Sequence, residues 1–363
     1  MPSQLTAHPS DIPFNNLYNL LQPITVPSKH TRFTNWGRSF TCTPSAIFEP
    51  ESEFQCELVL ELARREGKSI RVAGVGHSPN DLACTSQYML RTTKLNRLLE
   101  VTWLFLSFVY YLRIVYLQVN SEKLYVVCQA GITLNDLHAQ LSKNNLAMSN
   151  VGSISDQSLG GVITTATHGS GIAYGVLSTQ VRALSLLLAD GSRASCSRTE
   201  RPDLFLATIC GLGATGIILS VQLDVEPIFR LKEKQQSLPF DEVLQNFDNH
   251  VHSAEHVRFW WFPTMDVVRC SYSDRTNEVK LFLFFLPTLT CAQLLQQAPN
   301  PVGSWLWHSL IGYHVIQFFL FMGRYFLFLN TYVANFACWL ASGDSLGIDD
   351  SYRIFNIDCR VSL

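Results

Sequence analysis

The sequence predicts an α+β protein, because short helix and strand patterns are mixed with a β-hairpin and do not repeat as a regular βαβ series. Hydrophobic residues make up 47% of the 363 residues, enough for a sizeable core and two or three domains. Charged residues make up 15%, against about 25% in a typical globular protein. This composition excludes a disordered chain, and the net charge of −2 gives no support to nucleic-acid binding.

Part of the charge deficit lies in three apolar segments, residues 102–118, 279–293 and 304–342, which hold one charged residue each. The low charge content therefore has two possible explanations, a membrane protein or a deficit confined to a few segments. No Lys or Arg precedes Lys29 and no early apolar run occurs, so neither a secretory signal nor an Arg-rich transit peptide is expected. The ten cysteines form no CxxC pair, which favours reduced, mostly buried thiols.

The N-terminal part is expected to begin with a polar tail over residues 1–34. A strand follows at 46–48, and Pro50 is expected to open a helix that runs to about residue 65 and ends at Gly67. Another strand over 69–72 leads into a glycine-rich turn.

The middle of the chain is expected to continue with a strand over 124–129 and a helix capped by Thr133, with Asp136 three residues later. Alternation then predicts a hairpin with its turn at Asp190 and Gly191. The expected hairpin strands, the next helix and the last strand cover 179–189, 193–197, 202–211 and 217–225.

The first glycine loop is Gly74-Val75-Gly76-His77-Ser78-Pro79, directly after a predicted strand. Glycines there let successive N–H groups converge on an anion. A Rossmann GxGxxG is excluded, because Pro79 occupies the third glycine position and no helix is expected to follow. A bare GxG turn is more often purely structural.

The second glycine loop covers residues 151–171, which contain five glycines among many serines and threonines. The apolar Leu159, Val162 and Ile163 distinguish it from a low-complexity segment. A long loop of this kind usually lies against a ligand, and it offers donors for a diphosphate and small side chains for a flat ring. A mobile surface loop is the alternative interpretation.

The two loops together carry a specific resemblance. The GVGHSP run with Asp81 and Cys84, followed by Gly160-Gly161-Val162-Ile163-Thr164 and Thr167-His168-Gly169, resembles the aldonolactone oxidases, in particular the fungal ones. These are flavoproteins of the vanillyl-alcohol-oxidase type. The flanking residues 33–52 and 206–227 fit the same family, and the resemblance covers about 33–360.

The resemblance implies a fold with a two-subdomain FAD-binding domain over residues 35–229 and a partial α+β cap domain over 230–363. It also implies that His77 is bonded covalently to the 8α-methyl of FAD, as a neutral imidazole acting as nucleophile. The other cofactor contacts that it implies are Gly74, Val75, Gly76, Ser78, Ser153, Ser158, Gly161, Thr165, His168 and Ile217.

The implied reaction is the oxidation of a sugar 1,4-lactone, such as D-arabinono-1,4-lactone, with molecular oxygen as the final acceptor and hydrogen peroxide as a product. Ser158 is the one candidate for a catalytic residue near the substrate. The family's C-terminal His-Trp-x-Lys motif does not occur, so the main catalytic groups are expected beyond Leu363. A dehydrogenase with another acceptor and an incomplete flavin-binding fragment stay open, as does a membrane-anchored protein with a degenerate loop.

Three features depart from the family pattern. Residues 101–118 and 279–293 read as inserts, because their removal restores the continuity of the family, and the chain stops where the family continues. Retained introns are the favoured explanation of the inserts, and membrane anchors are the rival. Related fungal enzymes associate with mitochondrial membranes, so the resemblance implies a mitochondrial membrane location, with residues 304–342 as cap-domain core or membrane-contacting surface.

A histidine cluster suggests a metal site as a weaker alternative. His250 and His252 would place two imidazoles on one strand face, near His256, but no carboxylate or Cys cluster supports a metal there. No metal is therefore expected. Residues 255–263 instead resemble the start of the family's cap domain.

Overall fold

The computed structural model describes residues 8–101, 124–278, 314–341 and 343–356. The chain forms two compact units. The first unit comprises Met1–Ser149, Ser155–Thr167 and Val176–Pro227, and the second comprises Asn150–Ile154, His168–Gly175 and Ile228–Leu363. The two expected inserts lie almost wholly outside the described residues, and the domain limits 35–229 and 230–363 stay a prediction.

A three-stranded parallel sheet opens the first unit, with β5 (Tyr88–Arg91) between β3 (Ala46–Phe48) and β4 (Ile70–Ala73). Helix α2 (Glu53–Glu66) connects β3 to β4. The helix starts three residues later than predicted from Pro50, because the Ser52 hydroxyl caps it by accepting a hydrogen bond from the Gln55 N–H. Gly67 ends it with φ +64°, as predicted.

The expected polar tail contains a helix instead, α1 (Phe14–Leu21). Leu17 and Leu21 are fully buried against α2, which explains why the segment folds although its composition is polar. A hairpin of β1 (Phe33–Thr34) and β2 (Thr41–Cys42) follows. Short 3-10 turns complete this part of the chain at Pro9–Asp11, Gln22–Ile24, Ser28–His30 and Thr92–Lys94.

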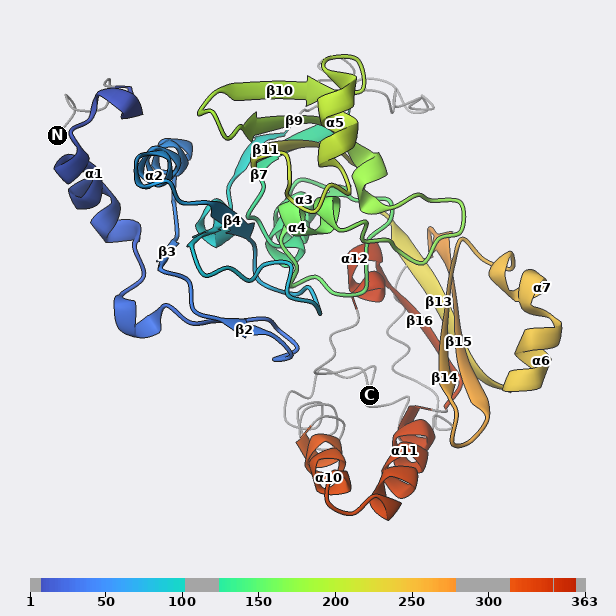
Figure 1. Ribbon diagram of the computed structural model, residues 1–363. Coiled ribbons are helices and arrows are strands. Elements are labelled where there is room, and N and C mark those ends of the chain that lie inside the picture. Colours follow the sequence, from blue (N-terminus) through green and yellow to red (C-terminus); the bar gives the residue numbers. More distant parts are fainter. Residues whose placement is uncertain (1–7, 102–123, 279–313, 342, 357–363) are drawn as a thin grey trace, which may run out of the picture. The chain divides into compact units, whose positions relative to one another are not determined.

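A five-stranded antiparallel sheet forms the other half of the first unit (Figure 1), in the order β10-β9-β11-β7-β6. Gly191, with φ +88°, forms the predicted turn between β9 and β10. Leu187, Ile217 and Leu219 from this sheet share one hydrophobic core with the helices α1 and α2. The strands are β6 (Leu98–Val101), β7 (Tyr125–Gln129), β9 (Val181–Leu187), β10 (Arg193–Ser197) and β11 (Ile217–Asp224).

The remaining elements of the first unit include helix α4, which lies within the second glycine loop, and helix α3, which is hydrogen-bonded to that loop. Helix α3 begins at the predicted cap, because Thr133 Oγ1 accepts a hydrogen bond from the Asp136 N–H. The leucines on one face of this helix, Leu134, Leu137 and Leu141, are fully buried, and this burial anchors the helix. These elements are α3 (Leu134–Lys143), β8 (Leu146–Ala147), α4 (Leu159–Thr164), the 3-10 helix Leu177–Gln180, α5 (Pro202–Thr208) and β12 (Glu226–Pro227).

The second unit is built on a four-stranded antiparallel sheet in the order β14-β15-β13-β16. Val243, Val268 and Cys270 form a small core between this sheet and helix α6. The elements are β13 (Arg230–Pro239), α6 (Phe240–Gln245), α7 (Phe247–Val251), β14 (His256–Phe262), β15 (Val267–Thr276), β16 (Ser345–Asp350) and α12 (Ser351–Phe355). The α+β class is thus confirmed in both units.

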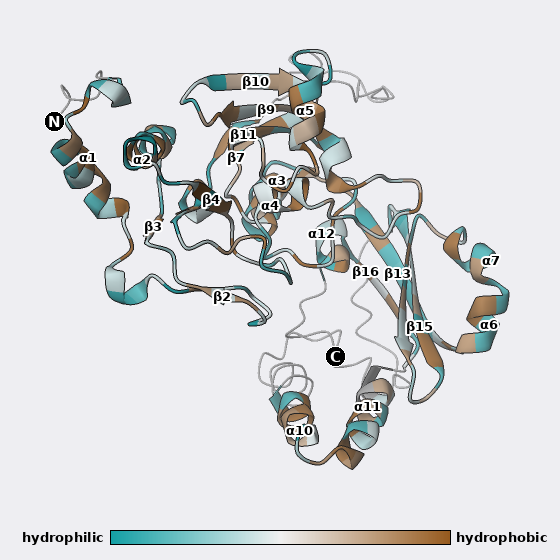
Figure 2. Ribbon diagram, viewed as in Figure 1, coloured by the Kyte–Doolittle hydropathy of each residue, from teal (hydrophilic) through white to brown (hydrophobic). Residues whose placement is uncertain are grey.

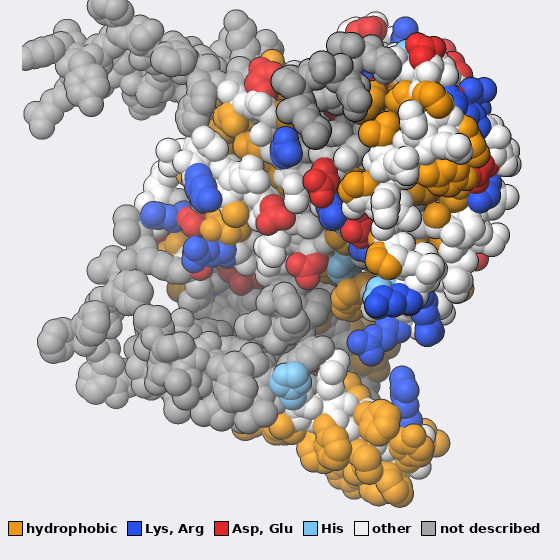
Figure 3. Space-filling model, turned by 90° about the vertical axis from the view of Figure 1, so that its left-hand side faces the viewer, with side chains coloured by type: hydrophobic (Ala, Val, Ile, Leu, Met, Phe, Trp, Pro, Cys, Tyr) orange, Lys and Arg blue, Asp and Glu red, His pale blue; other side chains and the backbone are white. Residues whose placement is uncertain are grey.

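Two apolar helices, α10 (Ile316–Gly323) and α11 (Phe328–Ala341), lie within the third charge-poor segment. Figure 2 shows their hydrophobic colouring, and Figure 3 shows apolar side chains gathered on their surface. Phe318, Phe321, Tyr332 and Trp339 are all more than half exposed. Among the described residues, no helix has both the length and the apolar character to cross a membrane.

The eight described cysteines are all unpaired, and Cys56, Cys128, Cys196, Cys270 and Cys338 are buried. Burial raises the pKa of Cys56 and of Cys128 to about 12. These thiols therefore behave as small apolar core groups, as the spacing of the cysteines predicts.

Candidate functional site

The first glycine loop forms a sharp turn at the end of β4. Gly76 has φ +81°, and a Cβ atom there would lie 2.9 Å from Phe33 Cζ. Both the backbone conformation and the space therefore require glycine. No helix follows before β5, so the exclusion of a Rossmann motif is confirmed.

The second glycine loop is partly fixed against helix α3. The Leu134 and Asn135 N–H groups donate to the carbonyl oxygens of Gln157 and Ser155, at 2.9 and 2.8 Å. The Gly160 N–H donates to the Ala130 carbonyl oxygen at 2.7 Å. Residues 155–164 are therefore a packed part of the first unit, and the alternative of a surface loop is wrong for them.

The two loops meet inside the first unit. A Cβ atom on Gly74 would lie 2.0 Å from Ser158 Oγ, so the glycine permits the contact. A cavity of about 430 Å³ opens beside this contact. Its lining comes from residues 71–80, 82, 83, 92, 130, 157, 158, 160–162, 164, 165, 167, 212, 213, 216 and 218.

The donor set of this cavity fits a dinucleotide cofactor with a diphosphate. Arg71 is the one lining residue with a permanent charge, and no acidic residue lines the cavity. Within the described residues, the N–H groups of 75–78 donate no hydrogen bond to a protein group. Consecutive free N–H groups beside a cation attract an anion, and the glycine surfaces leave room for a flat ring.

His77 is half-buried in the cavity lining. Desolvation lowers the pKa of its imidazole, and the negative charge of Asp156 opposes this shift. The net shift is downward, so the ring is mostly neutral at pH 7 and retains a nitrogen lone pair. The electrostatics of the site are therefore compatible with a nucleophilic imidazole.

The structure brings most of the expected site residues together. The residues at the cavity surface are Gly74, Val75, Gly76, His77, Ser78, Ser158, Gly161 and Thr165. Ile217 is buried in the core with 4% exposure, while its neighbours Gly216 and Ile218 line the cavity. Ser153 and His168 are exposed residues of the second unit, and their roles stay predictions.

Several lining residues were not predicted from the sequence. Arg71 and Thr92 lie in or beside the parallel sheet, and Gly213 and Gly216 precede β11. Arg71 lies three residues before Gly74, so a cation shortly before a glycine turn is the signal that identifies it. Thr92 has no such signal, because its position depends on strand pairing.

The second unit holds a separate polar cluster. Glu255 Oε1 accepts hydrogen bonds from the Tyr174 hydroxyl at 2.5 Å and from Arg275 Nε at 2.9 Å. His256 stacks on Tyr174, with ring centroids 5.4 Å apart, and is 2% exposed. Neither of its ring nitrogens has a hydrogen-bond partner among the described residues, and burial lowers its pKa to about 4.

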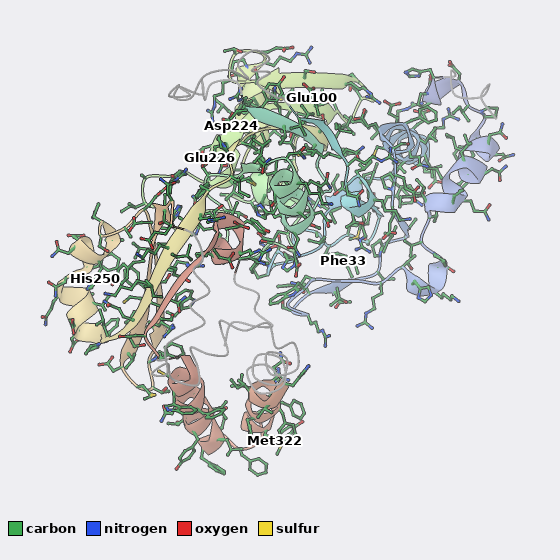
Figure 4. The ribbon with its side chains drawn as sticks, turned by 180° about the vertical axis from the view of Figure 1, so that it is seen from behind. Phe33, Glu100, Asp224, Glu226, His250 and Met322 are labelled. Carbon is green, nitrogen blue, oxygen red and sulfur yellow. The ribbon has the colours of Figure 1, made fainter. Side chains whose placement is uncertain are left out.

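The alternative metal site, with His250 and His252 on one strand face, is wrong in its geometry. His250, labelled in Figure 4, lies in helix α7, and its Nδ1 is 2.6 Å from the Tyr272 hydroxyl oxygen. His252 follows the end of that helix, and only His256 lies in a strand. Among the described residues, no group of three or more metal-ligating side chains comes together.

Comparison with known proteins matches two family profiles to different parts of this chain. A family profile described as an FAD binding domain matches residues 44–197, and one described as D-arabinono-1,4-lactone oxidase matches residues 221–363. An L-gulonolactone oxidase of Mus musculus is 36% identical over 335 residues, which cover 92% of this chain and 67% of that protein. This chain belongs to the aldonolactone oxidase family.

A yeast relative supports the same assignment, and a solved structure supports the fold alone. A D-arabinono-1,4-lactone oxidase of Yarrowia lipolytica is 35% identical over 290 residues, covering 79% of this chain and 49% of that protein. A cholesterol oxidase variant of Brevibacterium sterolicum shares the fold with a TM-score of 0.61 and 15% identity, covering 88% of this chain and 60% of its own. This aldonolactone oxidase family member thus spans about two thirds of the mouse relative and half of the yeast relative.

Proposed function

We propose that this chain oxidises a sugar 1,4-lactone, with FAD in the cavity of the first unit as the acceptor of the substrate hydride. The expected reaction converts D-arabinono-1,4-lactone and oxygen into dehydro-D-arabinono-1,4-lactone, known as D-erythroascorbate, and hydrogen peroxide. The observation that carries the proposal is the cavity where the two glycine loops meet, with free N–H groups, Arg71 and no acidic residue. The family of the chain supplies the reaction class.

The residues of this chain bind and orient the cofactor. The N–H groups of residues 75–78 and the Arg71 guanidinium supply positive potential for the diphosphate. Gly74 and Gly161 let the backbone approach a planar ring closely. Bound FAD supplies the hydride-accepting ring, and the protein supplies its position and its electrostatic environment.

Ser158 is the proposed residue nearest the substrate. Its side chain is 3% exposed and faces Gly74 at the point where the loops meet. A hydroxyl there can donate a hydrogen bond to a lactone oxygen or accept one from a substrate hydroxyl. We expect a Ser158→Ala variant to raise KM for the lactone or lower kcat, both measured with saturating FAD.

D-Arabinono-1,4-lactone and L-gulono-1,4-lactone are the two candidate substrates, because relatives named for each are similar to this chain. Purified protein should consume oxygen and form hydrogen peroxide in equal amounts with at least one of them. Absence of turnover with both lactones, in protein that binds FAD, would contradict the proposed activity. Reduction of a dye without peroxide formation would instead favour a lactone dehydrogenase.

The His77 imidazole is the proposed point of covalent attachment to FAD. Attachment would form a bond between an imidazole nitrogen and a methyl carbon of FAD, and would remove one proton from each. The two electrons released would pass to molecular oxygen, which would take up two protons and become hydrogen peroxide. The neutral state of the half-buried ring supports this role. Protease digestion should yield one flavin-bearing peptide, and it should contain His77.

A mitochondrial membrane location is also part of the proposal. The exposed aromatic side chains of α10 and α11 support a peripheral contact with lipid. A Phe318→Ser, Phe321→Ser double variant should float less with lipid vesicles than the unsubstituted chain does. Equal flotation, or no flotation of either protein, would contradict membrane attachment through these helices.

A further inference from the structure

The hairpin of β1 and β2 holds the backbone on both sides of His77. At its tip, the Trp36 N–H donates to the Gly76 carbonyl oxygen at 2.8 Å. The Asn35 side-chain amide donates to the Ser78 carbonyl oxygen at 3.0 Å. The carbonyl groups of the residues on either side of His77 are therefore both bonded to two consecutive residues of one hairpin.

Asn35 is itself fixed within the hairpin. It is 4% exposed, and its Oδ1 accepts a hydrogen bond from the Phe40 N–H at 3.0 Å. Its Nδ2 also donates to Ser39 Oγ at 3.0 Å. Phe33 of β1, labelled in Figure 4, is buried and lies close to Gly76. The hairpin thus packs onto the glycine loop through a satisfied polar residue and an apolar one.

Trp36 contacts the His77 side chain directly. The two rings are stacked, with centroids 5.4 Å apart and an interplanar angle of 21°. Trp36 is nevertheless 60% exposed, so core burial does not explain its position. Stacking restricts rotation of the imidazole about its side-chain bonds, which would otherwise be free on a half-buried turn.

We propose that Trp36 and Asn35 are positioning residues that orient the His77 imidazole for bond formation with FAD. The inference rests on the proposed attachment through His77. A nucleophile reacts faster when its lone pair is held in the direction of the bond that forms, because less orientational entropy is lost at the transition state. Asn35 fixes the backbone, and Trp36 fixes the ring plane.

The test measures the rate at which acid-stable flavin forms after FAD is added to flavin-free protein. We expect Trp36→Ala to slow attachment about tenfold, and Trp36→Phe, which keeps a stacking ring, to recover most of the rate. The matched control is Trp261→Ala, which removes a similarly exposed tryptophan from β14 and should leave the rate unchanged. Equilibrium FAD affinity, measured separately, should change less than about twofold in Trp36→Ala, because the indole is absent from the cavity lining.

The possible outcomes separate the two ideas. Attachment at the normal rate in Trp36→Ala overturns the positioning role, while the linkage through His77 stands. A chain without substitutions that never forms acid-stable flavin, or a His77→Ala variant that forms it, refutes the linkage and the positioning role together. A parallel loss of FAD affinity in Trp36→Ala and Trp36→Phe also overturns the proposal, since it would indicate a purely structural role for the indole.

Discussion

At the scale of single residues, the site depends on a few positions with strict local requirements. Gly76 needs a positive φ and lies against Phe33, and Gly74 faces Ser158. Such requirements leave a clear pattern in the sequence, which is why the glycine loops could be found from it, whereas His77 was identified through the family resemblance that these loops carry. Trp36 lies about 40 positions before His77, and its stacking depends on the pairing of a short hairpin, which no local pattern predicts.

His256 gives a residue-scale prediction about acid stability. Burial lowers its folded-state pKa to about 4, against 6.5 for an unperturbed imidazole. The unfolded chain therefore binds more protons between these values, and stability is lost as the pH falls from 6.5 towards 4. This one group should cost roughly 2 kcal/mol of unfolding free energy between pH 8 and pH 5.

The check is urea denaturation at pH 8 and pH 5 in the unsubstituted chain and in His256→Phe. The variant keeps a ring between Tyr174 and Phe355 and removes the titration. It should lose less stability on acidification. His138, whose pKa burial lowers to about 4, remains in both proteins and accounts for a residual loss. An identical pH dependence in the two proteins would rule out the contribution assigned to His256.

At the scale of elements, the helices and strands that were predicted best are those whose ends are fixed by a capping residue or a turn glycine. Helix α3 begins at the Thr133 cap and β9–β10 turns at Gly191, as expected. Helix α2 was predicted to start at Pro50, but Ser52 makes the capping hydrogen bond. Helix α1 was missed because only a few of its side chains are buried, and its stability comes from packing against α2.

Helix α3 gives a prediction that links an element to the site. Thr133→Ala removes the hydroxyl that caps the helix, and this should destabilise the first unit by about 1 kcal/mol. Because the N–H groups of Leu134 and Asn135 hold the second glycine loop, FAD affinity should fall as well. Thr133→Ser keeps the hydroxyl and serves as the control. Thermal unfolding and FAD titration of both variants test this, and equal behaviour of Ala and Ser would contradict it.

At the scale of the whole molecule, the low charge content has more than one source. Residues 102–118 and 279–293 lie outside the described residues, so their interpretation as inserts stays a prediction. The third segment contains α10 and α11, whose exposed aromatic side chains include Phe318 and Trp339. Composition alone could not separate these cases, because hydropathy counts apolar residues without telling what covers them.

The family and the fold class were predictable because the two glycine loops occur in a fixed order with distinctive residues between and around them. The pairing of strands and the composition of the cavity wall were not predictable. Gly213 and Gly216, for example, reach the cavity only because β11 lies between β9 and β7 in the antiparallel sheet. Contacts of this kind depend on the whole chain topology.

The FAD content of purified Gly74→Ala tests the central claim most directly, because the added methyl group would clash with Ser158 inside the proposed cofactor cavity. The matched control is Gly347→Ala in β16, where a Cβ atom meets nothing within 4 Å. We expect the unsubstituted chain and Gly347→Ala to contain about one FAD per chain, and Gly74→Ala to bind FAD at least about tenfold more weakly. Equal flavin content in the two variants, or no flavin in the unsubstituted chain, would contradict the assignment of this cavity.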